Sequence, residues 1–89
     1  MDAGRLAELA FRKAGTMVHL QQAIYYYTRA RAFRRIEGLL ASLTPEQRRA
    51  AEQSAGVLGA RAEYFRQSGQ WDAAMRDLRR AVSLPDAGS

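Results

Sequence analysis

The stretch from Tyr64 to Leu84, YFRQSGQWDAAMRDLRRAVSL, decides the fold that we predict for this 89-residue chain. A helix ends in the aromatic pair Tyr64-Phe65, the chain turns at Gly69, and Trp71 opens the next helix. Small and apolar residues then recur with the spacing of one helix face, at Ala74, Met75, Leu78, Ala81 and Val82. Because alanines let a second helix approach closely, we expect a helical hairpin with Phe65 and Trp71 in its core.

Composition limits what can hold this domain together and what it can bind. The chain has no cysteine and one histidine, so we expect no disulfide, no metal and no cofactor. Fourteen basic residues, all arginine except Lys13, exceed nine acidic ones and give a net charge of +5. Guanidinium groups bind carboxylates and phosphates through two hydrogen bonds. We therefore expect an acidic partner, whether an acidic peptide, a nucleic acid or an anionic membrane surface.

The N-terminal segment carries charges at Asp2, Arg5, Glu8, Arg12 and Lys13, which is not the pattern of a signal peptide. No uninterrupted apolar run approaches the ~18 residues that a membrane-spanning helix needs. The absence of cysteine is compatible with a reducing compartment. We expect a cytoplasmic protein, or a domain cut from a larger one.

Apolar spacing and capping residues predict one all-α domain over residues 1–85. We expect four antiparallel helices, at about 3–14, 17–42, 45–68 and 71–84, followed by a disordered tail at 86–89. The clearest start signal is Thr44-Pro45-Glu46-Gln47. Thr44 caps the helix, Pro45 takes the first helical position, and Gln47 can complete a capping box.

The predicted helix at 17–42 is unusual because it has two apolar faces. One face carries Leu20, Ala23, Ile24, Tyr27 and Ala30, and the nearly opposite face carries Phe33, Ile36, Leu39, Leu40 and Leu43. Either the helix lies between two neighbours, or it kinks near residues 31–34.

Gly56 and Gly59 interrupt the predicted helix at 45–68. Each costs about 1 kcal/mol of helix propensity relative to alanine. We expect another backbone, or a ligand, to come close at these positions.

The C-terminal third resembles a tetratricopeptide repeat (TPR) unit, in which small residues mark the helix crossing and an aromatic follows a glycine turn. The matching residues are Ala62, Phe65, Gly69, Trp71, Ala74, Leu78 and Ala81, with Pro85 closing the unit. A fainter copy with Ala23, Tyr27, Ala30 and Phe33 resembles the second helix of another unit, whose first helix is residues 3–14. Matching alanines lie 51 residues apart instead of ~34. The resemblance therefore implies two TPR-like hairpins with extended helices.

The chain also resembles the microtubule-interacting and trafficking (MIT) family of three-helix domains. Leu58 to Phe65, LGARAEYF, is similar to the third helix of that family, and the fourth helix would be an addition. This alternative implies binding of tail motifs from membrane-remodelling proteins.

The TPR resemblance also implies a groove lined by the first helix of each pair. It selects Arg5, Glu8 and Arg12 in the first predicted helix, and Gly56, Gly59, Glu63 and Arg66 in the third. The carboxylate clamp of the TPR family uses Asn and Lys, whereas this chain has no Asn and a single Lys. Arg12 and Arg66 can hold an acidic side chain in their place.

Two further surfaces are candidates from the residues themselves. Of the three consecutive tyrosines, we expect Tyr27 in the core, Tyr25 against a second neighbour and Tyr26 exposed for docking. Arg29, Arg31, Arg34 and Arg35 form either an acidic docking patch or a solvated face. The predicted partner-binding residues are Arg5, Arg12, Tyr26, Arg31, Arg34, Arg35, Glu63 and Arg66.

The sequence favours a non-catalytic protein–protein interaction module that docks an acidic or amphipathic helical segment. An MIT-type domain and a nucleic-acid-binding protein are the alternatives, and a homodimer would cover alanine-rich helices that have little core of their own. We find no phosphate loop, acid pair or nucleophile, and His19 has no partner at a catalytic or metal-binding spacing.

Overall fold

The structure is a computed structural model that describes residues 2–85, so the predicted tail at 86–89 lies outside the described residues. Within this range the chain forms six α-helices and no strand: α1 (Ala3–Ala14), α2 (Met17–Arg29), α3 (Phe33–Ala41), α4 (Pro45–Glu52), α5 (Ala55–Gln67) and α6 (Trp71–Ser83). The all-α prediction is confirmed, but the prediction of four helices is wrong, because both long predicted helices are broken. None of the six helices is long and apolar enough to cross a bilayer.

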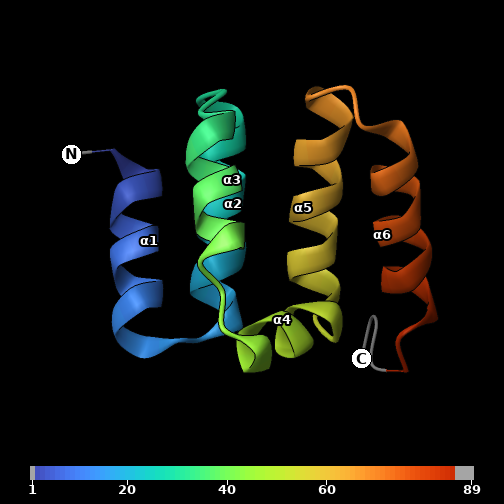
Figure 1. The fold of residues 1–89 in the computed structure, drawn as a ribbon, viewed down its shortest axis with the longest axis horizontal. Coiled ribbons are helices and arrows are strands. Elements are labelled where there is room, and N and C mark those ends of the chain that lie inside the picture. The colour runs from blue at the N-terminus through green and yellow to red at the C-terminus, as the bar shows by residue number, and fades with distance from the viewer. Residues whose placement is uncertain (1, 86–89) are drawn as a thin grey trace.

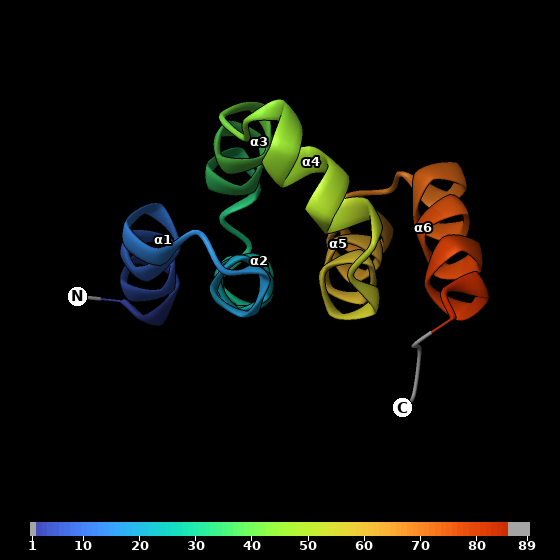
Figure 2. The same cartoon turned by 90° about the horizontal axis from the view of Figure 1, so that it is seen from below.

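The helices form two layers. Figure 1 shows α1, α2, α5 and α6 side by side, and Figure 2 shows α3 and α4 on one side of that row. In Figure 1, α1 and α6 run down the page, whereas α2 and α5 both run up. The two central helices are therefore parallel, not antiparallel as predicted, because α3 and α4 return the chain to its starting end before α5 begins.

The first break replaces the predicted helix at 17–42 with two helices joined by a tight reversal. Arg31 has a positive φ of 57°. Its N–H donates to the Thr28 carbonyl at 3.0 Å, and the N–H of Ala32 donates to the Tyr27 carbonyl at 2.8 Å. These two bonds make a Schellman motif at the end of α2. The kink alternative is thus confirmed as a full reversal, and it explains the two apolar faces, since folding α3 back turns both of them toward one core.

The second break falls at Ser54 within the predicted helix at 45–68. The Ser54 hydroxyl accepts a hydrogen bond from the Val57 N–H at 3.2 Å and caps α5. The predicted capping box is confirmed one helix earlier, where Thr44 and Gln47 exchange hydrogen bonds of 3.1 and 2.9 Å. Ser54, ten residues after Thr44, is thus a second and weaker cap signal. Because it starts a new helix, α4 is short and ends at Glu52.

The predicted reversal at Gly69 is confirmed. Gly69 has a φ of 84°, its N–H donates to the Arg66 carbonyl, and the N–H of Gln70 donates to the Phe65 carbonyl at 2.8 Å. The core role predicted for Trp71 is wrong, since that side chain is 60% exposed. α6, which packs against α5, instead buries Ala74 and Asp77.

The two reversals reveal which helices are equivalent. Arg31 and Gly69 lie 38 residues apart, close to the ~34-residue TPR period, and each is followed two residues later by an aromatic that opens the next helix, Phe33 or Trp71. The equivalent hairpins are therefore α2–α3 and α5–α6. α1 also forms a close antiparallel pair with α2, as predicted for residues 3–14, and the chain reverses between them at Gly15, which has a φ of 74°.

α1 packs closely on α2 because Gly4 faces the ring of Tyr27. A Cβ atom at Gly4 would lie 2.6 Å from Tyr27 Cδ1. Tyr27 is buried, as predicted, and its hydroxyl donates to Glu8, which also accepts from Arg12 at 2.7 Å. The main core continues through α2, α3 and α5, with Leu20, Ile24, Ile36, Leu39, Val57 and Tyr64.

Candidate binding groove

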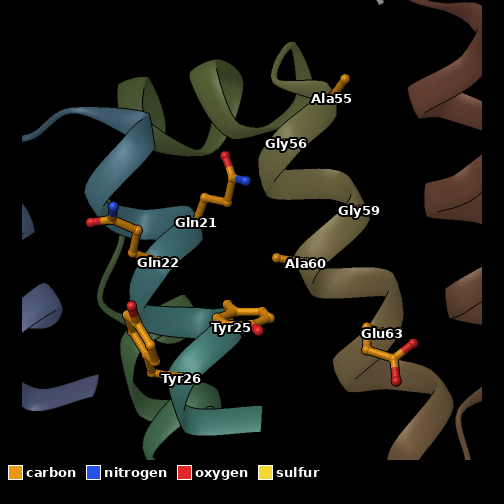
Figure 3. Close-up of a pocket in the computed structure, with 9 residues that line it drawn as sticks. All are labelled: Gln21, Gln22, Tyr25, Tyr26, Ala55, Gly56, Gly59, Ala60 and Glu63. Carbon is orange, nitrogen blue, oxygen red and sulfur yellow. The ribbon is translucent and has the colours of Figure 1, made fainter. Parts of the chain in front are cut away.

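A groove runs between α2 and α5, the first helices of the two equivalent hairpins. It has a volume of about 620 Å³. Figure 3 shows the Tyr25 ring and the Ala60 methyl pointing toward each other from the two helices. The lining residues are Gln21, Gln22, Tyr25 and Tyr26 on α2, and Ala55, Gly56, Gly59, Ala60 and Glu63 on α5. Most of the α5 wall is made of small residues, so the groove is open there because the side chains are short.

The two glycines of α5 act differently in this wall. A Cβ atom at Gly56 would lie 2.2 Å from Gln21 Oε1, so this glycine accommodates a side chain from α2. A Cβ atom at Gly59 would meet nothing within 4 Å, so this glycine faces open space in the groove. The expected close approach thus occurs at Gly56, but the approaching group is a side chain. At Gly59 the structure leaves room that a ligand can occupy.

Glu63 lies at the edge of the groove with its charge already paired. Its carboxylate accepts hydrogen bonds from Arg66, at 3.0 Å from Nε, and from Gln67 Nε2 at 2.7 Å. The hydrogen bonds from Arg66, then that from Gln67, lower the pKa of Glu63 to about 2. Of the two predicted α5 site residues, Glu63 lines the groove, whereas Arg66 holds it from outside.

The groove continues past Tyr25 into a second compartment of about 270 Å³. The two compartments share Tyr25, Ala60 and Glu63, and the second adds Thr28, Arg29 and Gln67. The Arg29 guanidinium donates to the Tyr25 hydroxyl at 2.9 Å and lies 5.7 Å from the ring centroid. Arg29 was counted with the arginine patch in the sequence, and its groove position was missed. Its four-residue spacing from Tyr25 was the available signal.

The tyrosines follow the prediction in two of three cases. Tyr27 is in the core, and Tyr26 is exposed and lines the groove. Tyr25 does not pack on a second neighbour, since it is 47% exposed and stands in the groove at 5.3 Å, edge to face, from the ring of Tyr26. The buried positions of α2 are Leu20, Ala23, Ile24, Tyr27 and Thr28, which leaves Tyr25 on the exposed side of the helix.

The predicted arginine patch lies apart from the groove, at the reversal between α2 and α3. Arg31, Arg34 and Arg35 line a shallow depression together with Ala32, Phe33 and Glu37. Arg31 lies over the Phe33 ring and Arg35 over the Tyr27 ring, at 5.3 and 5.9 Å. This depression shares no lining residue with the groove.

The remaining predicted site residues, Arg5 and Arg12, lie on α1 and do not line the groove. Burial raises the pKa of Glu8, but hydrogen bonds from Tyr27 and Arg12 outweigh it and hold the pKa below its ordinary value. Arg12 therefore helps to keep Glu8 ionised beneath α2. The TPR resemblance selected these residues for a groove lined by α1, whereas the groove described above is lined by α2 and α5.

Within residues 2–85 there is no group of three His, Cys, Asp or Glu side chains that could hold a metal ion. His19 lies in a shallow depression with Leu6 and Tyr26, and its Nδ1 atom is buried without a hydrogen-bond partner.

Paired antiparallel helices, repeated with their first helices parallel around a shared groove, define a helical-repeat protein. A family model described as tetratricopeptide repeat matches residues 1–88. The chain therefore belongs to the tetratricopeptide repeat family, whose members are in general protein–protein interaction modules. Comparisons with curated proteins and with solved structures found no match.

Proposed function

We propose that this protein binds an amphipathic helical segment of a partner protein in the groove between α2 and α5. The main support for this proposal is that α2 and α5, the first helices of the two repeats, flank an open groove. The α5 wall of this groove consists mostly of small, apolar residues. The apolar face of the bound helix lies against Tyr25, Tyr26 and Ala60. An acidic side chain of that helix lies near Arg29.

The shape of the groove supports a helix as the bound element. Helices pack at interaxial distances of 8–10 Å, and small residues favour the close end of that range. Ala55, Gly56, Gly59 and Ala60 give α5 such a surface. The tyrosines opposite supply rigid aromatic area with a polar end, which is typical of residues that dominate binding energy. Grooves of this kind bind a helix through its apolar residues, which are spaced three and four positions apart.

The charges around the groove support an acidic partner. Glu63 is already bound by Arg66 and Gln67, so it offers little to a cationic ligand. Arg29 is exposed and donates to the Tyr25 hydroxyl, and it has no carboxylate partner within residues 2–85, so its charge is available to a partner's carboxylate. The chain as a whole carries +5, which would also steer an acidic partner toward it.

A pair of glycine substitutions tests the groove. Gly59→Gln adds a side chain to the open groove, whereas Gly38→Gln adds the same side chain to the exposed side of α3, where a Cβ also meets nothing within 4 Å. Both remove a mid-helix glycine, so both variants should fold. A photo-crosslinking residue in place of Tyr25 identifies the partner segment, and a synthetic peptide of that segment is then titrated by fluorescence anisotropy.

We expect Gly59→Gln to weaken peptide binding at least tenfold and Gly38→Gln to leave it unchanged. Arg29→Gln should weaken binding and reduce its dependence on salt. Equal affinity of the two glycine variants would place the binding site elsewhere and refute the proposal. A peptide without an apolar helical face would refute the helix part of it.

The arginine patch supports one other candidate function, nucleic-acid binding. Arg31, Arg34 and Arg35 form no ion pair within the described residues, so three cations are available to phosphates. Binding of a fluorescent single-stranded DNA should then fall steeply as salt rises. The triple substitution to glutamine should remove that binding while leaving the groove peptide bound.

For the MIT alternative, tail peptides of membrane-remodelling proteins are the appropriate ligands in the same titration.

A further inference from the structure

The outer face of α6 carries an apolar stripe that nothing in the described chain covers. Trp71, Met75, Leu78 and Val82 are spaced four, three and four residues apart, so they lie on one side of the helix. Their exposed fractions run from 45% for Leu78 to 80% for Val82. Contiguous exposed apolar patches on monomeric proteins commonly mark interaction sites.

The equivalent hairpin shows what such positions normally do in this fold. Shifted back by the 38 residues that separate the two reversals, Trp71 corresponds to Phe33 and Leu78 to Leu40. Both of these residues pack against the core, and the Phe33 ring lies 5.8 Å from the ring of Tyr64 on α5. In the first hairpin these positions therefore pack against helices that follow in the chain. In the second hairpin Trp71 and Leu78 are exposed, by 60% and 45%.

We propose that the α6 stripe is a self-association surface on which a second copy of this chain packs its own α6, antiparallel, about a two-fold axis. With the axis between Met75 and Leu78, Trp71 of one copy lies beside Val82 of the other. Met75 then lies beside Leu78. A large residue thus meets a smaller one at each end of the contact.

Charges along one edge of the stripe identify a second copy as the occupant. Asp72 and Arg79 are seven residues apart, two helical turns, so they lie on the same edge. Within residues 2–85 neither makes an ion pair. A two-fold axis perpendicular to both helices keeps that edge on the same side in both copies. It brings Asp72 of each copy beside Arg79 of the other, so the edge is complementary to itself.

The proposed dimer leaves the binding groove open. No residue of the stripe lines the groove between α2 and α5, so each dimer presents two grooves. Two linked grooves bind a partner with two docking segments more tightly than one, by effective concentration. A single helix–helix contact is smaller than the ~1,600 Å² of a standard interface, so we expect a weak dimer.

Sedimentation equilibrium over roughly 10 μM to 1 mM tests the proposal, because weak interfaces associate in this range. The mass should rise from that of a monomer toward that of a dimer. Leu78→Glu should weaken dimerisation at least tenfold, whereas Val18→Glu, at an apolar position on α2 that is 59% exposed against 45% for Leu78, should leave it unchanged. A circular dichroism spectrum like that of the wild type confirms that each variant is folded.

A charge exchange separates this geometry from other modes of association. Arg79→Asp should weaken dimerisation about threefold, in line with the modest strength of exposed ion pairs. Combining it with Asp72→Arg should restore the wild-type constant, because both charges of each pair are reversed. A monomer throughout the concentration range would overturn the proposal. So would failure of the double variant to recover, or loss of association on Leu6→Glu, which would indicate head-to-tail packing of α6 on α1.

Discussion

Arg61 on α5 and Asp77 on α6 form a buried, bidentate ion pair that joins the two helices of the C-terminal hairpin. Arg61 Nε lies 2.6 Å from Asp77 Oδ2, and Nη2 lies 2.9 Å from Oδ1. The same guanidinium reaches Glu52 of α4 at 2.6 Å. The hydrogen bonds that Arg61 donates to Asp77 are the largest influence on its pKa and raise it despite burial. One arginine therefore ties three helices together where the predicted Trp71 contact is absent.

Asp77→Asn should destabilise the protein by about 2–4 kcal/mol, because it leaves a largely buried guanidinium with one charged partner. Asp72→Asn, on the exposed side of the same helix, should cost less than about 1 kcal/mol. Urea unfolding followed by circular dichroism measures both values. Equal costs would mean that the pair adds nothing beyond the usual effect of an acid near the start of a helix.

Arg31→Gly should stabilise the protein, by up to about 1 kcal/mol, because glycine adopts the left-handed conformation of this residue without steric cost. Arg35→Gly, inside α3, should instead cost about 1 kcal/mol of helix propensity. The opposite signs distinguish the reversal from a continuous helix, in which both substitutions would be destabilising. Chemical denaturation of the two variants decides between them.

Gly4→Ala should destabilise the protein by about 1–3 kcal/mol, since the added methyl would push the Tyr27 ring out of its place. Gly38→Ala should raise stability by up to about 1 kcal/mol, because its methyl meets nothing and alanine favours helix. Melting temperatures that move in opposite directions are the expected result. A stabilising Gly4→Ala would show that α1 does not pack this closely on α2.

Glu63 should titrate near pH 2, well below its ordinary value of 4.5, because Arg66 and then Gln67 bind its ionised form. Since the folded pKa is the lower one, the stabilising contribution of the carboxylate is complete above about pH 4.5 and is lost as pH falls toward 2. Carboxyl NMR resonances report the midpoint, and Arg66→Gln should raise it. The stability difference between wild type and Glu63→Gln should shrink over the same interval, and a difference independent of pH would contradict the pairing.

Local signals in the sequence were sufficient for several elements of the fold. Residues within one or two turns of each other form the capping box at Thr44-Pro45-Glu46-Gln47 and the reversal at Gly69. Both features could therefore be predicted from the spacing of residues along the chain. The reversal at Arg31 was harder, because an arginine occupies the position that glycine usually takes. The one sign of this reversal in the sequence was the change of apolar face near residues 31–34.

The binding groove was only partly predictable. Gly56, Gly59 and Glu63, which the family pattern selected on α5, line the groove between α2 and α5. Arg5 and Arg12, which it selected on α1, lie outside that groove. The 38-residue spacing of the reversals at Arg31 and Gly69 aligns α2 with α5, and Tyr25, Tyr26 and Arg29 on α2 then take the place of the α1 residues.

The sequence by itself determined that this chain is all-α, that it turns at Gly69 and that it has the residue pattern of tetratricopeptide repeats. These features depend on contacts between residues close in sequence. Only the tertiary structure decided that α2 lies beside α5, that Trp71 faces outward and that Arg61 reaches Asp77. Those relationships depend on how whole helices are placed against one another, and that placement changes completely when one arginine in a left-handed conformation reverses the chain.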